Sequence, residues 1–168
     1  ASLGPVNQQK FIDVISATTQ DAPGQTAVRR IENEFAALLK STSAGQGLLQ
    51  QDKNETTHTL LDSLHEMATQ RLCAEDLVVR RGELLRSTLG NITATFSEVD
   101  QGKTVSCVAT VGTTQLAAEY SAEYVRILSE VSQTGSARLI TEQSGRRILS
   151  TDKVLQLDCS SLDPATMK

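Results

Sequence analysis

Aromatic residues are scarce in this chain of 168 residues: they make up 3% of the sequence, and tryptophan is absent. A hydrophobic core must therefore be built from aliphatic side chains, and the aromatic side chains that stack on bases in nucleic-acid-binding proteins are almost missing. The formal net charge of −4 also counts against a surface for the phosphate backbone, which needs concentrated positive charge. We therefore expect no nucleic acid partner.

Long hydrophobic runs are absent as well. No apolar stretch approaches the roughly 18 to 20 residues that span a bilayer, so we expect no transmembrane segment in this chain. The sequence begins with Ala1 rather than methionine. This start favours a processed terminus, and hence an extracytoplasmic protein, secreted or periplasmic, over the cytoplasmic alternative.

Cysteine is infrequent, with Cys73, Cys107 and Cys159 separated by distances that match no zinc-binding or redox motif. In an oxidising compartment an odd number indicates one disulfide and one unpaired or intermolecular thiol, whereas in a reducing compartment it indicates three buried thiols. If a disulfide forms, the sequence favours Cys107 with Cys159, because both lie in short alternating segments of the C-terminal third.

Two sequons for N-glycosylation occur, at Asn54 and Asn91. Serine and threonine are so frequent in this chain that two sequons are not a significant number. Ile92, inside the second sequon, belongs to an apolar helical stripe, so a glycan on Asn91 requires that flank to face solvent. The sequons alone therefore do not predict glycosylation.

Apolar residues recur at helical spacing through most of the first 99 residues. A short helix is predicted at about 6–20, and a second one at about 26–40, separated by a stretch that contains proline and glycine. Residues 41–54 lack a period and are predicted as a polar loop. The stripe from 57 to 99 contains no strong breaker, so it predicts either one long helix or two helices separated near residues 73–76.

Beyond a predicted turn at 100–102, the apolar period changes from 3.6 to 2. The pattern predicts a strand at 105–111, a helix from 116 that ends at Gly135, a hairpin around Ser144-Gly145 with arms at 138–141 and 147–150, and a further strand at 154–157. The expected fold class is mainly α with a small α+β part: a helical bundle plus a strand-helix-hairpin unit. A wholly helical fold is the alternative. The corresponding regions are a helical bundle at 1–99, the α+β region at 103–160 and a tail at 161–168.

Histidine occurs twice, and both residues lie in one short segment. His58, Asp62 and His65 are spaced i, i+4 and i+7, so they share one face of a helix, and two imidazoles with a carboxylate are ligands that a divalent metal accepts. That face lies away from the apolar stripe of the same helix, so we expect it to face solvent. The sequence also contains no nucleophile elbow and no phosphate-binding glycine loop. We therefore expect no catalytic, cofactor-binding or metal-binding residues and no cofactor.

Apolar stripes that step by four and three residues are the strongest remaining feature. They supply candidate interface residues, although packing inside the same domain explains such stripes too: Leu85, Leu89, Ile92, Phe96, Tyr120 and Tyr124. We expect a non-enzymatic structural or interaction subunit, extracytoplasmic or part of a larger assembly, that contacts protein partners or itself through its helices. The alternatives are a small metal-dependent hydrolase using His58, Asp62 and His65, and a cytoplasmic acidic chaperone or regulator.

Overall fold

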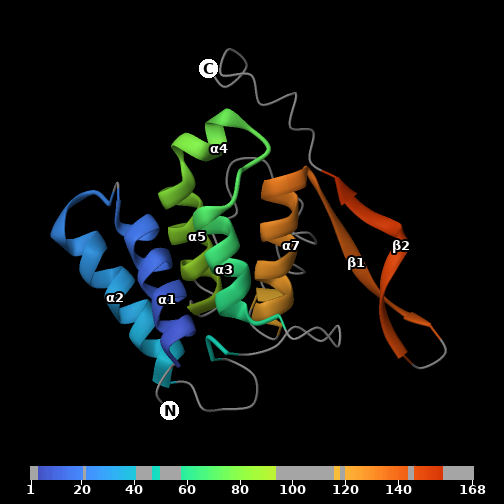
Figure 1. Cartoon of the computed structure of the whole chain (residues 1–168), viewed down its shortest axis with the longest axis horizontal. Helices are drawn as coiled ribbons and strands as arrows, with labels where there is room; N and C mark the ends of the chain where they lie inside the picture. Colours follow the sequence, from blue (N-terminus) through green and yellow to red (C-terminus); the bar gives the residue numbers. More distant parts are fainter. Residues whose placement is uncertain are drawn as a thin grey trace.

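The computed structural model describes residues 4–20, 22–40, 47–49, 58–93, 116–117, 120–143 and 146–156. Most of them lie in helices, and an antiparallel pair of strands follows the last helix (Figure 1). The predicted class, mainly α with a small α+β part, is confirmed. The elements in chain order are α1 (Pro5–Thr19), α2 (Gly24–Lys40), α3 (Leu60–Thr69), α4 (Glu75–Val79), α5 (Arg81–Thr93), α7 (Ser121–Thr134), β1 (Ser136–Gln143) and β2 (Arg146–Gln156).

The first two helices match their predictions closely. Pro5 occupies the start of α1, where its missing N–H costs no helical hydrogen bond. Gly24, at the start of α2, has φ of +83°, a backbone conformation that side chains with a Cβ rarely adopt. The predicted loop at 41–54 and the predicted strand at 105–111 lie outside the described residues, apart from residues 47–49.

The stripe from 57 to 99 folds as separate helices rather than as one long helix. The chain leaves α3 after Thr69, and the guanidinium group of Arg81 then donates to the carbonyl oxygens at the end of that helix, those of Met67, Ala68 and Gln70. The N–H of Cys73 donates to the carbonyl oxygen of Ser132 on α7 at 2.8 Å. Both contacts connect residues distant in sequence, and they satisfy backbone groups that a continuous helix would have paired internally.

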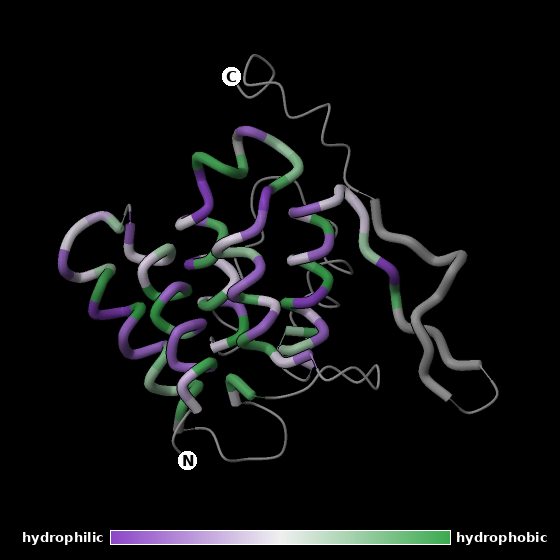
Figure 2. The backbone as a smooth tube through the Cα atoms, in the orientation of Figure 1, coloured by the Kyte–Doolittle hydropathy of each residue, from purple (hydrophilic) through white to green (hydrophobic). Residues whose placement is uncertain are grey.

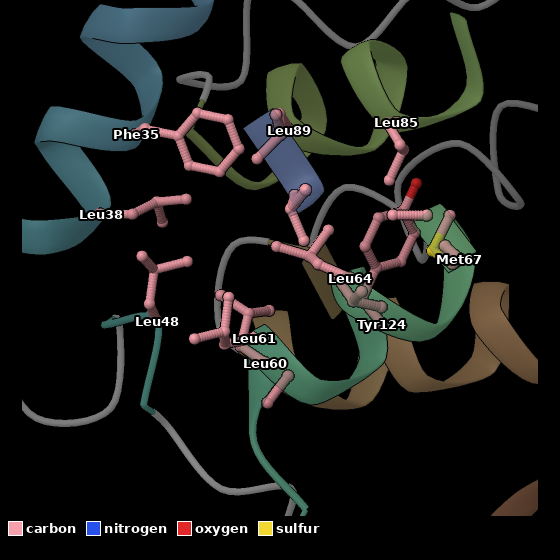
Figure 3. Packing of buried hydrophobic residues seen from close by; sticks show 14 of the residues in the cluster. Phe35, Leu38, Leu48, Leu60, Leu61, Leu64, Met67, Leu85, Leu89 and Tyr124 are labelled. Carbon is pink, nitrogen blue, oxygen red and sulfur yellow. The ribbon is translucent and has the colours of Figure 1, made fainter. Parts of the chain in front are cut away.

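Helix α3 lies at the centre of the bundle and packs against α1, α5 and α7, while α2 packs against α1 and α5 (Figure 1). Of the hydrophobic positions coloured along the backbone in Figure 2, those in the core come from α1, α2, α3, α5 and α7, whereas Val78 and Val79 of α4 are exposed. The resulting core includes completely buried side chains from four helices: Val14, Leu60, Leu61, Leu64, Met67, Leu85, Leu89 and Val125. Figure 3 shows Leu61, Leu64 and Leu89 from α3 and α5 within this cluster. Helix α7 shares this core with α1, α3 and α5. The predicted division near residue 100 lies outside the described residues and stays a prediction.

The hairpin forms where the sequence predicts it. Gln143 pairs with Arg146 across a two-residue connection, and the arms run antiparallel to a last pair between Ser136 and Gln156. The register shifts in the middle, because Arg138 pairs with Val154 whereas Ile140 pairs with Leu149. One residue of β1 therefore lies opposite four residues of β2, at 150–153, and this irregularity on β2 interrupts the ladder. In Figure 1 the hairpin projects beyond α7, away from the rest of the bundle.

Candidate functional site

The three residues of the predicted metal set each contact a different side chain. His65 Nε2 lies 3.1 Å from Asp13 Oδ2, and Asp62 accepts a hydrogen bond from Lys10. His58 precedes α3 and lies 3.0 Å from Glu66 Oε1. Two of the three therefore face α1 instead of solvent, so the expectation of a solvent-facing surface is wrong for Asp62 and His65. Within the described parts of the chain, no three His, Cys, Asp or Glu side chains gather as a ligand set for a metal ion.

Asp62 also caps the first turn of helix α3. Its carboxylate accepts from the N–H and the hydroxyl of Thr59, both at 2.8 Å, while Thr59 Oγ1 accepts from the N–H of Asp62. This reciprocal capping box satisfies donors that the first helical turn leaves unpaired. Burial by itself raises the pKa of Asp62, but the hydrogen bonds from Lys10 and Thr59 outweigh it and lower the pKa below its ordinary value. The carboxylate is thereby held in its charged form.

A chain of polar side chains connects α3 to α7. Glu66 lies between His58 and Ser129: its Oε2 accepts from Ser129 Oγ at 3.3 Å, and Gln133 Nε2 donates to the same hydroxyl at 2.7 Å. A hydrolase triad requires the histidine to contact the serine, because the histidine must take the hydroxyl proton. Here the carboxylate occupies that middle position, and Ser129 is 1% exposed. This geometry is that of a structural connection between two helices.

The predicted interface residues lie mostly inside this chain. Leu85 and Leu89 are completely buried in the core, and Tyr124 is almost completely buried there. Ile92 is half-buried against the same core, Tyr120 is partly buried, and Phe96 lies outside the described residues. The reading of Leu85, Leu89 and Tyr124 as an intermolecular surface is therefore corrected: the four-three stepping reports helix packing within the domain.

Asn91 and Tyr124 form a hydrogen bond that bears on the second sequon. Asn91 Nδ2, the atom to which an N-glycan is attached, donates to the Tyr124 hydroxyl at 2.8 Å. Burial raises the pKa of Tyr124, and the hydrogen bond from Asn91 opposes that shift. A glycan on Asn91 would break this contact between α5 and α7. Asn54, in the first sequon, lies outside the described residues.

Cys73 lies between α3 and α4, where its Sγ is 3.7 Å from the carbonyl oxygen of Val131 on α7. Cys107 and Cys159, the pair that the sequence favours, lie outside the described residues, so that pairing stays a prediction.

The junction between α7 and β1 is the most highly charged buried part of the described structure. Arg126 is 5% exposed and contacts two carboxylates of its own helix: Nη2 lies 2.7 Å from Glu123 Oε1, and Nη1 lies 2.7 Å from Glu130 Oε1. Burial by itself lowers the pKa of Arg126, but Glu123 and Glu130 outweigh it and raise the pKa above its ordinary value. Sequence reasoning missed this cluster. The spacing of the three residues, which places them on one face of a helix, was the available signal.

This cluster holds the first half of the hairpin. Arg126 Nη2 donates to the carbonyl oxygen of Arg138 at 2.6 Å, and the N–H of Arg138 donates to Glu130 Oε2 at 3.2 Å. The N–H and carbonyl of Ser136 likewise engage the hydroxyl of Thr134, at 3.3 Å and 2.8 Å. The backbone groups of Ser136 and Arg138 therefore face away from β2, and side chains at the C-terminal end of α7 cover them.

The second half of the same strand edge is different. Backbone groups alternate in direction along a strand, so Ile140 and Glu142 face the same side as Ser136 and Arg138. The two-residue connection agrees, because a tight turn directs the carbonyl of Gln143 toward Arg146 and hence toward β2. In the part of the chain that the structure describes, the sheet has two strands, so no described strand pairs with this side of β1. We call these two positions the open edge of β1.

Comparison with known proteins identifies no relative: no family model, no curated protein and no solved structure matches this chain. The described helices also include none with the length and hydropathy of a membrane-spanning segment.

Proposed function

We propose that this chain is a non-enzymatic interaction subunit that contacts another protein through the β1–β2 hairpin. The observation that carries this proposal is the two-stranded sheet, which has no third described strand on the open edge of β1 and projects beyond α7 (Figure 1). A strand edge is a ready template for another chain, and a two-stranded hairpin is only marginally stable alone. A partner strand would add hydrogen bonds along this edge and stabilise the hairpin at the same time.

The buried charges on α7 support this role. Arg126 and Glu130 bond to the backbone of Arg138, and charge-assisted bonds of this kind are short and directional. They fix how β1 leaves the bundle and so present the open edge in a defined direction. This assignment moves the contact surface from the helices to the hairpin, because Leu85, Leu89 and Tyr124 are occupied in the core.

An extracytoplasmic location is part of the proposal. The three cysteines are compatible with it, because disulfides persist in oxidising compartments and are rare in the cytoplasm. Mass spectrometry of alkylated, unreduced protein from its natural source measures directly whether a disulfide is present. Three reduced thiols in freshly isolated protein would contradict the location and favour a cytoplasmic regulator.

Photo-cross-linking in the full chain tests the contact surface. A photoreactive residue at Leu139, on the half-buried side of β1, is expected to capture a second polypeptide, and reconstitution with purified components is expected to reproduce that product. The matched control is Val125, which is completely buried on α7 and should yield only products within the chain. Val79 on α4, which is 77% exposed, samples the helical surface. Capture from Val79 without capture from Leu139 would overturn the assignment to the hairpin.

A further inference from the structure

The second sequon is part of the folded bundle. Its two defining residues, Asn91 and Thr93, both lie in α5 and are partly buried. Asn91 Nδ2 donates to the Tyr124 hydroxyl on α7 at 2.8 Å, and Thr93 Oγ1 donates to the carbonyl oxygen of Leu89 at 2.7 Å. The amide and the hydroxyl that make this tripeptide a sequon are therefore both hydrogen-bonded within the folded chain.

We propose that Asn91 is an acceptor for N-linked glycosylation only while the chain is unfolded, and that a glycan there and the docking of α5 on α7 exclude each other. The substrate class is a lipid-linked oligosaccharide, which an oligosaccharyltransferase uses as its donor. This proposal goes beyond the function of the hairpin, because it concerns the assembly of the bundle.

The bond that forms joins Asn91 Nδ2 to the anomeric carbon of the first sugar. The bond that breaks joins that carbon to a phosphate oxygen of the donor, so the lipid diphosphate leaves, and one amide proton of Asn91 passes to a base of the transferase. The transferase must therefore reach Nδ2. In the folded chain this nitrogen lies against the hydroxyl of Tyr124, a residue that is 6% exposed, so a sugar attached to it meets α7.

The helix itself also keeps the transferase from recognising the sequon. Recognition requires the asparagine amide together with the hydroxyl two positions later, and residues i and i+2 of an α-helix do not face each other. Acceptor sequons therefore lie typically in surface loops. Because α5 continues through Thr93, its C-terminal end must unwind before both groups can be bound together.

Unwinding this end of α5 disturbs the core. Leu89 is completely buried, and Ile92, the middle residue of the sequon, packs against the same cluster. A segment that contributes buried side chains opens only in a minor fraction of folded molecules. The folded chain therefore presents Asn91 rarely, whereas a chain that has not yet folded presents it freely.

Glycosylation of the purified full chain tests this proposal. Asn54→Gln removes the other sequon, so any glycan then reports on Asn91. The folded Asn54→Gln chain is incubated with a purified oligosaccharyltransferase and its lipid-linked donor, beside the same chain with Leu64→Asp. Leu64 is completely buried, so the added charge unfolds the bundle and leaves the sequence around Asn91 unchanged. Circular dichroism verifies the two states.

We expect the unfolded chain to be glycosylated, and the folded chain to react roughly tenfold more slowly or less, because only locally opened molecules present the acceptor. Asn91→Gln in the unfolded chain should abolish the product. Equal rates for the folded and unfolded chains would overturn the proposal. An unfolded chain that receives no glycan while a standard acceptor peptide is modified would overturn it as well.

Translation into microsomes tests whether the glycan excludes docking. Chains glycosylated at Asn91 before they fold should be digested by protease faster than the unglycosylated fraction. The matched control moves the sequon to exposed positions of α2, with Asn91→Gln, Ala37→Asn and Leu39→Thr, and its glycosylated fraction should resist protease. If the two glycosylated fractions are equally resistant or equally sensitive, the exclusion at Asn91 is wrong. Either result leaves the role of the hairpin to the cross-linking at Leu139, which samples a separate surface.

Discussion

The interior of the bundle and the junction between α7 and β1 are both buried, but different forces hold them together. Leu60, Leu64 and Leu85 are completely buried in a cluster of aliphatic side chains (Figure 3). At the junction the buried side chains are Glu123 and Arg126, and Arg126 bonds both to Glu123 and to the backbone carbonyl of Arg138. The first region is stabilised by removing apolar surface from water, a force without direction. The second depends on bonds that require particular atoms at particular positions.

The difference assigns separate tasks to the two regions. Burial of aliphatic side chains supplies most of the free energy that folds the bundle, and it tolerates small changes of shape. A buried ion pair supplies little net stability, because desolvation offsets its attraction, but it is costly to break. The charges at the junction therefore serve mainly to orient the hairpin. Each prediction below changes one region and leaves the other intact.

Replacing Arg126 with leucine is expected to have the largest effect. The change leaves Glu123 buried without its cation and removes the donor to the carbonyl of Arg138. Breaking a buried pair from one side costs about 3–5 kcal/mol of the free energy of unfolding. Chemical denaturation followed by circular dichroism measures that loss, and hydrogen exchange should show faster exchange at the N–H of Arg138.

Arg29→Leu serves as the control for this variant. Arg29 is an exposed arginine on α2, so its loss should change stability little. Equal destabilisation by Arg126→Leu and Arg29→Leu would contradict a special role for the junction.

Leu64→Ala tests the bundle in the same way. Leu64 is completely buried at the centre of α3, so truncation leaves a cavity and should lower the free energy of unfolding by about 2–5 kcal/mol. Leu39→Ala, on α2, removes the same atoms from a side chain that is 46% exposed and should cost much less. The hairpin contacts do not involve Leu64, so hydrogen exchange at Arg138 should change only through global unfolding. Faster exchange confined to the hairpin in Leu64→Ala would contradict the separation of the two regions.

Two glycines of α5 should respond to alanine with opposite signs. A Cβ on Gly82 would lie 3.1 Å from the carbonyl oxygen of Ala17 and 3.0 Å from Arg86 Nη1, which itself donates to the carbonyl of Thr18. Crowding of this kind costs about 1–3 kcal/mol, which outweighs the gain in helix propensity, so Gly82→Ala destabilises.

Gly90 is the matched case. Among the described residues, a Cβ there would meet Arg30 Nη2 alone, at an ordinary contact distance of 3.6 Å. The helix propensity of alanine then dominates, and Gly90→Ala should stabilise by up to about 1 kcal/mol. Thermal unfolding of both variants checks the signs, and stabilisation by Gly82→Ala would show that α1 and α5 are packed less closely.

The sequence predicts the local elements well because their signals are local. Stripes of apolar residues define α1, α2 and α7, and Ser144-Gly145 between two short-period arms marks the hairpin, whose observed register agrees. The sequence did not decide whether the helix breaks between α3 and α5, because the contacts that cause the break involve residues far apart in the sequence. The guanidinium group of Arg81 donates a hydrogen bond to a carbonyl oxygen at the end of α3, and the N–H of Cys73 donates to the carbonyl oxygen of Ser132 on α7. Neither contact can be read from a local sequence pattern.

The polar groups show the same limit. Asp62 and His65 are spaced by three residues, and so are Lys10 and Asp13, with charges that match across the contact between α1 and α3. That match becomes visible only when the two helices are considered as a pair. When α3 is considered alone, the face around Asp62 is expected to face solvent. The metal interpretation of His58, Asp62 and His65 arose from considering one helix alone, and the partners on α1 and at Glu66 explain the same residues.

The pH dependence of stability should carry a small contribution from Asp62 in the bundle. Its pKa is lowered in the folded state below the ordinary value of 3.8, so the charged carboxylate stabilises the fold above that value, and the contribution disappears as the pH falls through the folded pKa. The free energy of unfolding of the unmodified chain should therefore fall more steeply on acidification than that of Asp62→Asn, and the two curves should converge at low pH. Glu75→Gln, at an exposed position, should leave the slope unchanged. Parallel curves for the unmodified chain and Asp62→Asn would show that Lys10 and Thr59 do not hold this carboxylate in its charged form, and the polar contact between α1 and α3 would then contribute no more than an exposed ion pair.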